Sequence, residues 1–258
     1  SPNFVLHFAA QAGVRYSIDN PNAYTNSNLL GFANILEACR NKKIKHLVLA
    51  SSSSVYGGNL NFPFKENENV DKPISFYAAT KKSNELMAYS YSHLFNMPIT
   101  CLRFFTVYGP WGRPDMALFL FTKLIKNNIP IKVFNKGNMY RDFTYIDDIV
   151  EAVFKITKKI PKHKVIFNKK LKIKTTLAPY KVFNIGNDKP ISLKKYIEII
   201  ENAIGKKGIK KYLPMQKGDL HYTHADTSNI KSWIDFKPKT DIKKGVKSFI
   251  KWYESYYK

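Results

Sequence analysis

The sequence has 258 residues, of which 44% are hydrophobic and 14% aromatic, enough for a buried core in one large domain or two. It contains no run of about eighteen apolar residues and no signal-peptide pattern, so neither a membrane span nor a membrane partner is expected. Its two cysteines, Cys39 and Cys101, provide neither the spacing of a metal site nor a disulfide framework. They favour a reducing compartment, and we expect a cytoplasmic protein without a bound metal.

The net charge of +23 is typical of proteins that bind nucleic acid. Of the 42 basic residues, however, 37 are Lys and only five are Arg, and the Lys are spread along the chain. We therefore favour a compositional bias and expect no nucleic-acid partner; a steep salt dependence of RNA or DNA affinity would indicate the alternative. The scarce Arg mark places that need a planar bidentate donor, for which Lys is no substitute. Three of them matter here: Arg103, Arg113 and Arg141.

The first hundred residues alternate between apolar strands and helices. Residues 4–10 form a continuous apolar run, which predicts a strand buried on both faces. A helix is expected to follow as far as about residue 40, with one apolar stripe. Strands are expected at 46–50 and 98–103, with a helix around Tyr77 between them. This alternation predicts right-handed crossovers and a parallel sheet.

After residue 104 the sequence changes character. The segment 157–180 has eight Lys, no acid and little periodicity, which predicts an exposed loop. Ser192 is expected to cap one helix, and the last helix is expected to begin at Asp241. The other expected elements are a proline-stiffened loop at 108–114, a helix at 116–127, strands at 131–134 and 181–185, and a helix from about residue 147.

One stretch carries the strongest chemical signal. The strand at 46–50 ends in four hydroxyls, and Tyr77 follows with Lys81 four residues later. In a helix these two side chains share a face, so an ammonium at Lys81 would lower the pKa of the Tyr77 phenol. A hydroxyl at the strand end would hold a substrate oxygen, which gives a base for an alcohol proton. The spacing alone also fits an ordinary solvated helix face, because a chain rich in Tyr and Lys produces such pairs by chance.

Several longer stretches carry a family resemblance. They are 7–17 (HFAAQAGVRYS), 51–57 (SSSSVYG), 102–110 (LRFFTVYGP), 112–116 (GRPDM), 141–148 (RDFTYIDD) and 178–187 (APYKVFNIGN). Together they resemble the extended short-chain dehydrogenase/reductases, in the NAD-dependent nucleotide-sugar epimerase/dehydratase group, and most of all the UDP-glucuronate 4-epimerases. The resemblance implies an α/β fold, with a Rossmann-like doubly wound parallel sheet and a smaller α/β substrate-binding domain. It places a partial NAD-binding domain at 1–106 and a mainly UDP-sugar-binding domain at 107–258, with a strand near 181–186 returning to the sheet.

The resemblance also implies the site residues. Tyr77 would take the proton of the sugar 4-hydroxyl, Lys81 would lower its pKa and bind the nicotinamide ribose, and Ser52 would complete the catalytic set. The residues expected to bind the NAD cofactor are His7, Ala9, Ala10, Gln11, Asn28, Ser51, Tyr77 and Lys81. Those expected to bind the substrate are Ser53, Thr106, Arg113, Arg141 and Asp219. Of these, Thr106 and Arg113 would lie around the sugar carboxylate, Arg141 at the diphosphate and Asp219 at the uridine ribose.

The implied reaction is NAD-dependent 4-epimerisation of UDP-glucuronate to UDP-galacturonate, by oxidation at C4, rotation of the 4-keto sugar and hydride return. A homodimer through helices near 21–40 and 75–96 is implied as well. Two alternatives stay open: a decarboxylase that makes UDP-xylose, and a truncated remnant that only binds UDP-sugars. A dehydratase is not expected, because Ser53 and Ser54 stand where dehydratases carry an Asp–Glu pair.

One family feature is missing from the sequence. None of the twelve glycines forms the Gly-x-x-Gly-x-x-Gly turn that places the NAD diphosphate at a helix N-terminus. We therefore expect the chain to be the C-terminal three-quarters of an epimerase, beginning at the fourth strand of the sheet. Lys217 also stands where the family usually has Pro. Two residues also have purely structural interpretations: Asn28 could start a helix, and Arg103 could form hydrogen bonds within the core.

Overall fold

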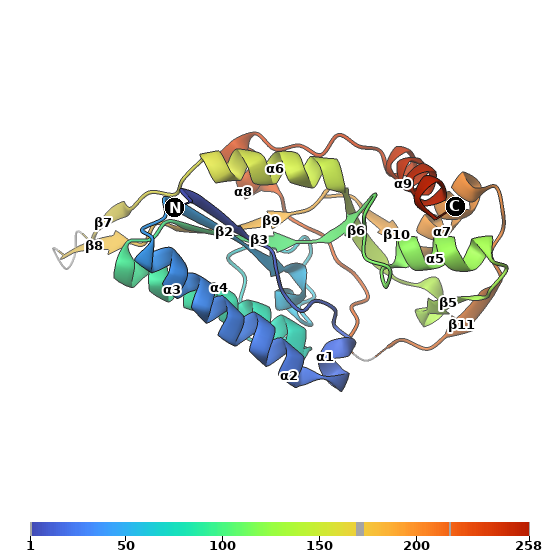
Figure 1. Ribbon diagram of the computed structural model, residues 1–258, viewed down its shortest axis with the longest axis horizontal. Helices are drawn as coiled ribbons and strands as arrows, with labels where there is room; N and C mark the ends of the chain where they lie inside the picture. Colours follow the sequence, from blue (N-terminus) through green and yellow to red (C-terminus); the bar gives the residue numbers. More distant parts are fainter. Residues whose placement is uncertain (1, 169–172, 217, 258) are drawn as a thin grey trace.

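The computed structural model describes residues 2–168, 173–216 and 218–257, and its framework is a parallel sheet (Figure 1). The strands lie in the order β1 (Phe4–His7), β2 (His46–Ser52), β3 (Ile99–Phe104) and β9 (Tyr180–Ile185), and every pairing among them is parallel. Their carboxyl ends therefore share one edge, which is where open α/β sheets bind ligands. The predicted α/β fold with a parallel sheet is confirmed.

Helices cover both faces of this sheet (Figure 1). The helices α3 (Gly31–Asn41) and α4 (Phe76–Phe95) lie on one face, and α6 (Ile146–Lys158) and α8 (Ser228–Ile234) lie on the other. Successive side chains of β2 alternate between the two layers. Leu47 and Leu49 pack with residues of α3 and α4, whereas Val48 packs with residues of α6 and α8. This burial on both sides is why the strand is apolar at consecutive positions.

The strand β1 is shorter and more exposed than its sequence predicts. The apolar run at 4–10 predicts burial on both faces, but the strand ends at His7, and Phe4 and Leu6 are 42% and 48% exposed. Within the described ranges β1 pairs with β2 alone, so it is an edge strand. The prediction of burial is wrong because an apolar run shows only that a strand is suited to burial, while burial itself needs neighbouring layers.

The helix expected as far as residue 40 is divided into four segments: α1 (Tyr16–Asp19), α2 (Pro21–Tyr24), the π-helix η1 (Thr25–Leu30) and α3. Asn20 separates the first two, since its Oδ1 accepts the Ala23 N–H at 3.3 Å and Pro21 occupies the first turn of α2. The π-helix has a wider turn than an α-helix, and such turns are frequent at functional sites. It contains Asn28, one of the predicted site residues.

The second half of the chain adds two small sheets beyond the carboxyl ends of the parallel strands (Figure 1). One has the order β10 (Pro190–Ser192), β6 (Tyr140–Tyr145) and β4 (Thr106–Tyr108), and the other pairs β5 (Ile131–Phe134) with β11 (Lys210–Leu213). The helices α5 (Ala117–Lys126), α7 (Leu193–Ile204) and α9 (Ile242–Tyr256) enclose an aromatic-rich core with them. The predicted cap Ser192 is confirmed, since its Oγ accepts the Lys195 N–H at 3.2 Å. The last helix starts next to Asp241, as predicted, and Asp241 Oδ1 caps it by accepting the Lys243 N–H at 2.9 Å. The division near residue 106 into two domains stays a prediction.

The Lys-rich segment 157–180 is not the loop that its composition predicts. Its first residues end α6, and β7 (Lys164–Asn168) pairs antiparallel with β8 (Ile173–Leu177) to form a hairpin, which projects from the end of the sheet (Figure 1). Residues 169–172 lie outside the described ranges. The described side chains at 165–167 are exposed, as expected. The loop prediction is wrong because the Lys count concealed β-branched and aromatic residues that favour strands.

Within residues 2–168, 173–216 and 218–257, no three His, Cys, Asp or Glu side chains come together as a metal site requires. In the same ranges no helix combines the length and the apolar character needed to cross a bilayer.

Candidate active site

The carboxyl end of β2 meets the face of α4 that carries Tyr77 and Lys81. Ser75 caps this helix by accepting the Ala78 N–H at 3.2 Å. The cap fixes where the helix begins, and therefore which of the following residues share a face. Lys81 is only 5% exposed, and its Nζ donates to the Ala50 carbonyl oxygen at 2.8 Å. Burial lowers the pKa of Lys81 to about 8, because the charged ammonium loses hydration there.

Tyr77 is half-buried, and its ring meets the Tyr24 ring edge-on with centroids 6.1 Å apart. Burial raises the pKa of the Tyr77 phenol, while a side-chain hydrogen bond with Ser52 and the charge of Arg113 lower it. The Lys81 ammonium donates to a main-chain carbonyl, and its effect on the pKa of Tyr77 stays a prediction. Helical spacing identifies the shared face but does not fix where a long side chain ends. The groups that favour the phenolate are therefore Ser52 and Arg113.

Asn28 holds the loop that follows β1. Its Oδ1 accepts the Gln11 N–H at 2.8 Å, and its Nδ2 donates to the Gln11 carbonyl and to Thr80 Oγ1, each at 3.0 Å. The side chain is 2% exposed, so it acts as a buried clamp between this loop and α4. Asn28 does not start a helix, since it lies inside η1. It fixes the main chain of Gln11 close to the strand end, whereas its contact with the cofactor stays a prediction.

The other residues expected near the cofactor follow β1. His7 ends this strand and stacks on Phe32 with ring centroids 5.4 Å apart. Burial lowers the pKa of His7, and the nearby charge of Lys81 acts in the same direction. Ala9 is exposed and Ala10 is half-buried, so their small side chains leave this edge of the sheet open.

Ser51 has a different environment from its neighbour Ser52. Its Oγ donates to Glu85 Oε1 at 2.6 Å, and Glu85 accepts two hydrogen bonds from Arg103 at 2.8 and 2.9 Å. The exposed fractions of these three side chains are 3%, 4% and 3%, so Arg103 has the core role that was its ordinary interpretation. Sequence reasoning missed Glu85, although an acid eight positions after Tyr77 shares the helical face of Tyr77 and Lys81. The predicted cofactor contact of Ser51 stays untested.

The five residues expected to bind the substrate line two neighbouring cavities. Thr106, Arg113, Arg141 and Asp219 line the larger one, which has a volume of about 590 Å³. Ser53 lines the smaller one, of about 110 Å³, together with Thr106, Arg141 and Asp219. Because three of the five line both cavities, the cavities adjoin, and the structure brings all five residues together.

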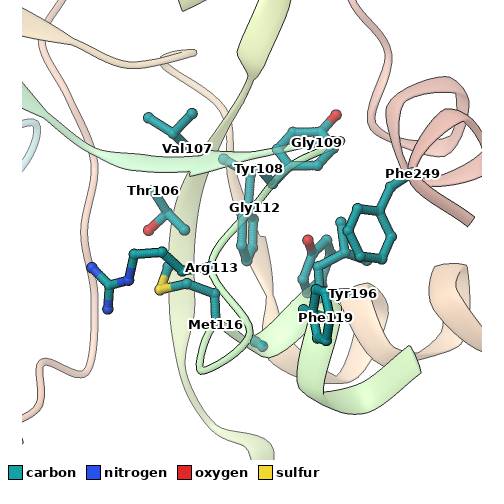
Figure 2. A pocket seen from close by; sticks show the side chains of 13 residues that line it. Thr106, Val107, Tyr108, Gly109, Gly112, Arg113, Met116, Phe119, Tyr196 and Phe249 are labelled. Carbon is teal, nitrogen blue, oxygen red and sulfur yellow. The ribbon is translucent and has the colours of Figure 1, made fainter. Parts of the chain in front are cut away.

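Figure 2 shows how Thr106 and Arg113 lie beside the aromatic core of the second half. Both residues also line a small cavity of about 50 Å³ next to that core. The Arg113 guanidinium points away from Phe119, Tyr196 and Phe249 (Figure 2). Since Arg113 also lines the larger cleft, the charged end of its side chain is available there.

The two cleft arginines expected to bind the substrate, Arg113 and Arg141, are paired with acids. Arg113 Nε and Nη2 donate to Asp115 Oδ1 and Oδ2 at 3.0 and 2.5 Å, and Arg141 Nη2 donates to Asp219 Oδ1 at 2.7 Å. The second pair joins residues 78 positions apart, which no local pattern reveals. Asp115 is only two residues from Arg113, so their ion pair could have been predicted from the sequence, but sequence reasoning missed it. Lys217, next to this site in the chain, lies outside the described residues.

A contact across the larger cleft joins the two halves of the chain. The Arg15 guanidinium carbon lies 5.3 Å from the centroid of the Phe134 ring, which is the geometry of a cation–π interaction. Arg15 follows β1, whereas Phe134 belongs to β5, and both line the cleft. Sequence reasoning did not select Arg15, although the scarcity of Arg was a signal for it.

The Asp142 carboxylate on β6 joins two other segments of the chain to this strand. Its carboxylate accepts the N–H groups of Asn187, Asp188 and Ala225 at 2.7, 3.1 and 3.0 Å. The side chain is fully buried, and burial raises its pKa against the lowering effect of these donors. Thr223 Oγ1, in the wall of the smaller cavity, accepts the Asp142 N–H at 3.3 Å. Asp142 therefore fixes the segment that carries Thr223 against β6, a role that sequence reasoning missed.

Comparison with known proteins identifies the family. A family model for the NAD dependent epimerase/dehydratase family matches residues 1–169. Protein CapI of Staphylococcus aureus is 55% identical over 258 residues, which are 100% of this chain and 77% of that protein. A probable UDP-glucuronate 4-epimerase of Rhizobium meliloti (strain 1021) is 46% identical over 259 residues, covering 100% of this chain and 76% of that protein. A solved UDP-glucuronic acid 4-epimerase from Bacillus cereus, in complex with UDP-glucuronic acid and NAD, is 31% identical with a TM-score of 0.87, covering 99% of this chain and 76% of that one.

This chain therefore belongs to the NAD dependent epimerase/dehydratase family, and NAD is its cofactor. The residues that would hold the nicotinamide end of this cofactor are Ser52, Tyr77 and Lys81, because Ser52 hydrogen-bonds Tyr77 and Lys81 bonds the end of β2. When bound, NAD accepts a hydride and returns it. The 258 residues contain no Gly-x-x-Gly-x-x-Gly turn, so the fit of these residues concerns the nicotinamide end.

Proposed function

We propose that this chain catalyses the NAD-dependent 4-epimerisation of a UDP-hexuronate, interconverting UDP-glucuronate and UDP-galacturonate. The observation that carries the proposal is the position of Arg113 and Arg141, two of only five Arg, on one cleft close to Tyr77. A UDP-hexuronate has two anionic groups, the sugar carboxylate and the diphosphate, and each suits a planar bidentate donor. The relatives named as UDP-glucuronate 4-epimerases support the same substrate.

The proton chemistry is assigned to the sheet side of the site. Tyr77 accepts the proton of the sugar 4-hydroxyl, and Ser52 holds that oxygen. Ser52 and Arg113 stabilise the phenolate, since both lower the pKa of Tyr77. Lys81 binds the nicotinamide ribose from its buried position at the end of β2. A positioned base of this kind contributes about 10² to 10⁴ in rate.

The cleft side holds the rest of the substrate. Oxidation at C4 turns the uronate into a β-keto acid, which loses CO₂ readily, so the enzyme has to fix the carboxylate. Thr106 and Arg113 are assigned to this group, Arg141 to the diphosphate and Asp219 to the uridine ribose. Ser53 lines the smaller cavity and is assigned to the sugar.

The test is product analysis with UDP-glucuronate and NAD, by chromatography and NMR. Formation of UDP-galacturonate, lost in the Tyr77→Phe variant, is the expected result. Release of CO₂ with a UDP-pentose as the main product would identify a decarboxylase instead. Calorimetric binding of UDP-glucuronate without any turnover would reduce the function to UDP-sugar binding.

We also propose that two copies of the chain associate through α3 and α4. Four apolar side chains are exposed by 46% or more next to this face: Leu30 at the end of η1, directly before α3, and Leu86, Tyr89 and Leu94 on α4. Leu86 and Tyr89 are three residues apart on one helix and share a face, and exposed apolar patches of this kind mark protein interfaces. Sedimentation should show a dimer that the double variant Leu86→Glu, Tyr89→Glu converts to a monomer. The matched change Leu120→Glu on α5 should leave the dimer intact.

A further inference from the structure

The ion pair between Arg113 and Asp115 is built to fix the plane of the guanidinium. Only Pro114 separates the two residues, and its ring restricts the main chain between them. The carboxylate engages Nε and Nη2 together, and two parallel hydrogen bonds set an orientation that one bond does not. The hydrogen bonds between the two groups raise the pKa of Arg113 and lower the pKa of Asp115, so both stay charged at neutral pH.

The pair leaves part of the guanidinium for a ligand. A guanidinium has five N–H donors on two bidentate edges, and Asp115 occupies the Nε–Nη2 edge. The Nη1–Nη2 edge can therefore receive a second carboxylate. Both residues line the larger cleft. Gly13, with φ of +111°, lies beside the group, since a Cβ there would be in ordinary contact with Arg113 Nη2 at 3.6 Å.

We propose that Asp115 is a positioning residue, which orients Arg113 for the substrate carboxylate and thereby limits loss of CO₂ from the 4-keto sugar. The inference rests on the proposed function and adds a residue to it. Arg113 is 44% exposed and has several rotatable bonds, so a free side chain would occupy many rotamers. Binding a carboxylate would then have to restrict them. Asp115 restricts them before the substrate arrives.

Orientation of Arg113 matters for the carboxylate because of where the charge goes during decarboxylation. Loss of CO₂ breaks the C5–C6 bond, and its electron pair moves to C5 and the C4 carbonyl as an enolate. Solvent then protonates C5. The negative charge thus leaves the carboxylate. A guanidinium held against that group therefore stabilises the 4-keto sugar that still has its carboxylate, and this opposes the loss of CO₂. A misoriented Arg113 gives up this stabilisation, so a larger share of turnovers ends in CO₂.

A competing role for Asp115 predicts the opposite change in the affinity for UDP-glucuronate when Asp115 is removed. If Asp115 occupied the edge that the substrate needs, its removal would tighten substrate binding. The geometry favours positioning, because Asp115 uses one edge and leaves the other open. Repulsion between two carboxylates is also screened by solvent at a pair that is 44% and 64% exposed.

The experiment compares Asp115→Ala, Asp115→Asn and Asp115→Glu with the unaltered protein, by calorimetry and by product analysis. Asp115→Ala is expected to bind UDP-glucuronate about three- to tenfold more weakly, and the ratio of UDP-pentose to UDP-galacturonate should rise several-fold. Asp115→Asn should be intermediate, and Asp115→Glu should recover most of the affinity. UDP-glucose has no carboxylate, so its binding should change by less than about twofold in every variant.

Three outcomes would overturn the inference: unchanged binding and products, tighter binding of UDP-glucuronate, or an equal loss for UDP-glucose. The last would show a general distortion of the cleft. Asp115 is 64% exposed, so we expect its removal to shift Tm by no more than about 2 °C. If the unaltered protein neither binds nor converts UDP-glucuronate, the proposed function itself fails, which is a distinct result.

Discussion

The two sides of the candidate site hold their charges in different ways. On the sheet side Lys81, Glu85 and Arg103 are at most 5% exposed, and hydrogen bonds fix them to a strand or to one another. On the cleft side Arg113 and Asp115 lie on a loop and are 44% and 64% exposed. Buried charges need close partners and are costly to separate, whereas exposed pairs exchange partners at little cost. The fold thus fixes the charges of the sheet side by burial, whereas Arg113 on the cleft side is held by an exposed pair that leaves one edge of its guanidinium open.

The largest effect is expected from Tyr77→Phe, which removes the proposed base on the sheet side. Turnover should fall by about 10² to 10⁴, while the fold stays intact. The matched control is Tyr24→Phe, since the Tyr24 ring packs against Tyr77 and its hydroxyl bonds the Gly13 carbonyl at 2.5 Å. Steady-state rates would contradict the assignment if both variants lost the same activity.

Glu85→Gln tests the rigidity of the sheet side. Breaking its buried pair with Arg103 leaves an uncompensated charge, which typically costs about 3 to 5 kcal/mol of unfolding free energy. The control is Glu254→Gln, because the Lys126–Glu254 pair is 34% and 49% exposed and should cost no more than about 1 kcal/mol. Urea unfolding measures both. Similar losses in the two variants would mean that burial of the Glu85–Arg103 pair does not make it costlier to break.

Arg141→Lys tests recognition on the cleft side. Lys cannot reproduce a bidentate contact with a diphosphate, so the affinity for UDP-glucuronate should fall by roughly 10- to 30-fold. Because the diphosphate is common to all UDP-sugars, UDP-glucose should lose the same factor in calorimetry. Arg113→Lys is the matched variant, and its loss should be confined to UDP-glucuronate. Loss of both ligands in both variants would contradict the separate roles of the two Arg.

The smallest effect concerns the burial of Lys81. The pKa of about 8 lies below the ordinary value, which corresponds to roughly 3 kcal/mol of stability lost when Lys81 is charged. The hydrogen bond to Ala50 offsets about 1 to 2 kcal/mol, so Lys81→Met should stabilise the fold by roughly 1 to 2 kcal/mol at neutral pH. Between about pH 8 and the ordinary Lys pKa near 10.4, Lys81 is protonated in the unfolded chain but neutral in the native protein.

Native Lys81 therefore gains stability as the pH rises through this window, and the advantage of Lys81→Met should shrink there. Denaturant unfolding at a series of pH values measures the difference. Lys251→Met, at an exposed position of α9, is the control and should show no such trend. A constant difference between wild type and Lys81→Met would mean that Lys81 is hydrated in the native state.

Local patterns predicted what depends on residues close in the chain. The strand at β2, the helix around Tyr77 and the caps Ser192 and Asp241 follow from periodicity and helix-start chemistry, which act over one or two turns. The shared face of Tyr77 and Lys81 is of the same kind. Such features are visible in sequence because no distant partner is needed to form them.

The rest depends on partners far away in the chain. Arg103 pairs with Glu85 across 18 positions and Arg141 with Asp219 across 78, and the Ala50 carbonyl that receives Lys81 belongs to another element. Exposure of β1 likewise depends on which layers lie beside it, and the β7–β8 hairpin on pairing between two short strands. The periodicity of a sequence does not reveal which distant segments pair, so these features become visible only in the structure.

Asn28 reaches Gln11 from inside a π-helix, so its direction depends on how many residues the segment contains. Removing one residue before Asn28 would restore α-helical geometry and turn the residues on either side of the deletion by about 100° relative to each other. The amide would then no longer face the loop after β1. Thr25, Asn26 and Ser27 are exposed, so other residue types can replace them. We therefore expect substitutions to accumulate in this turn over evolution, while insertions and deletions are excluded from it.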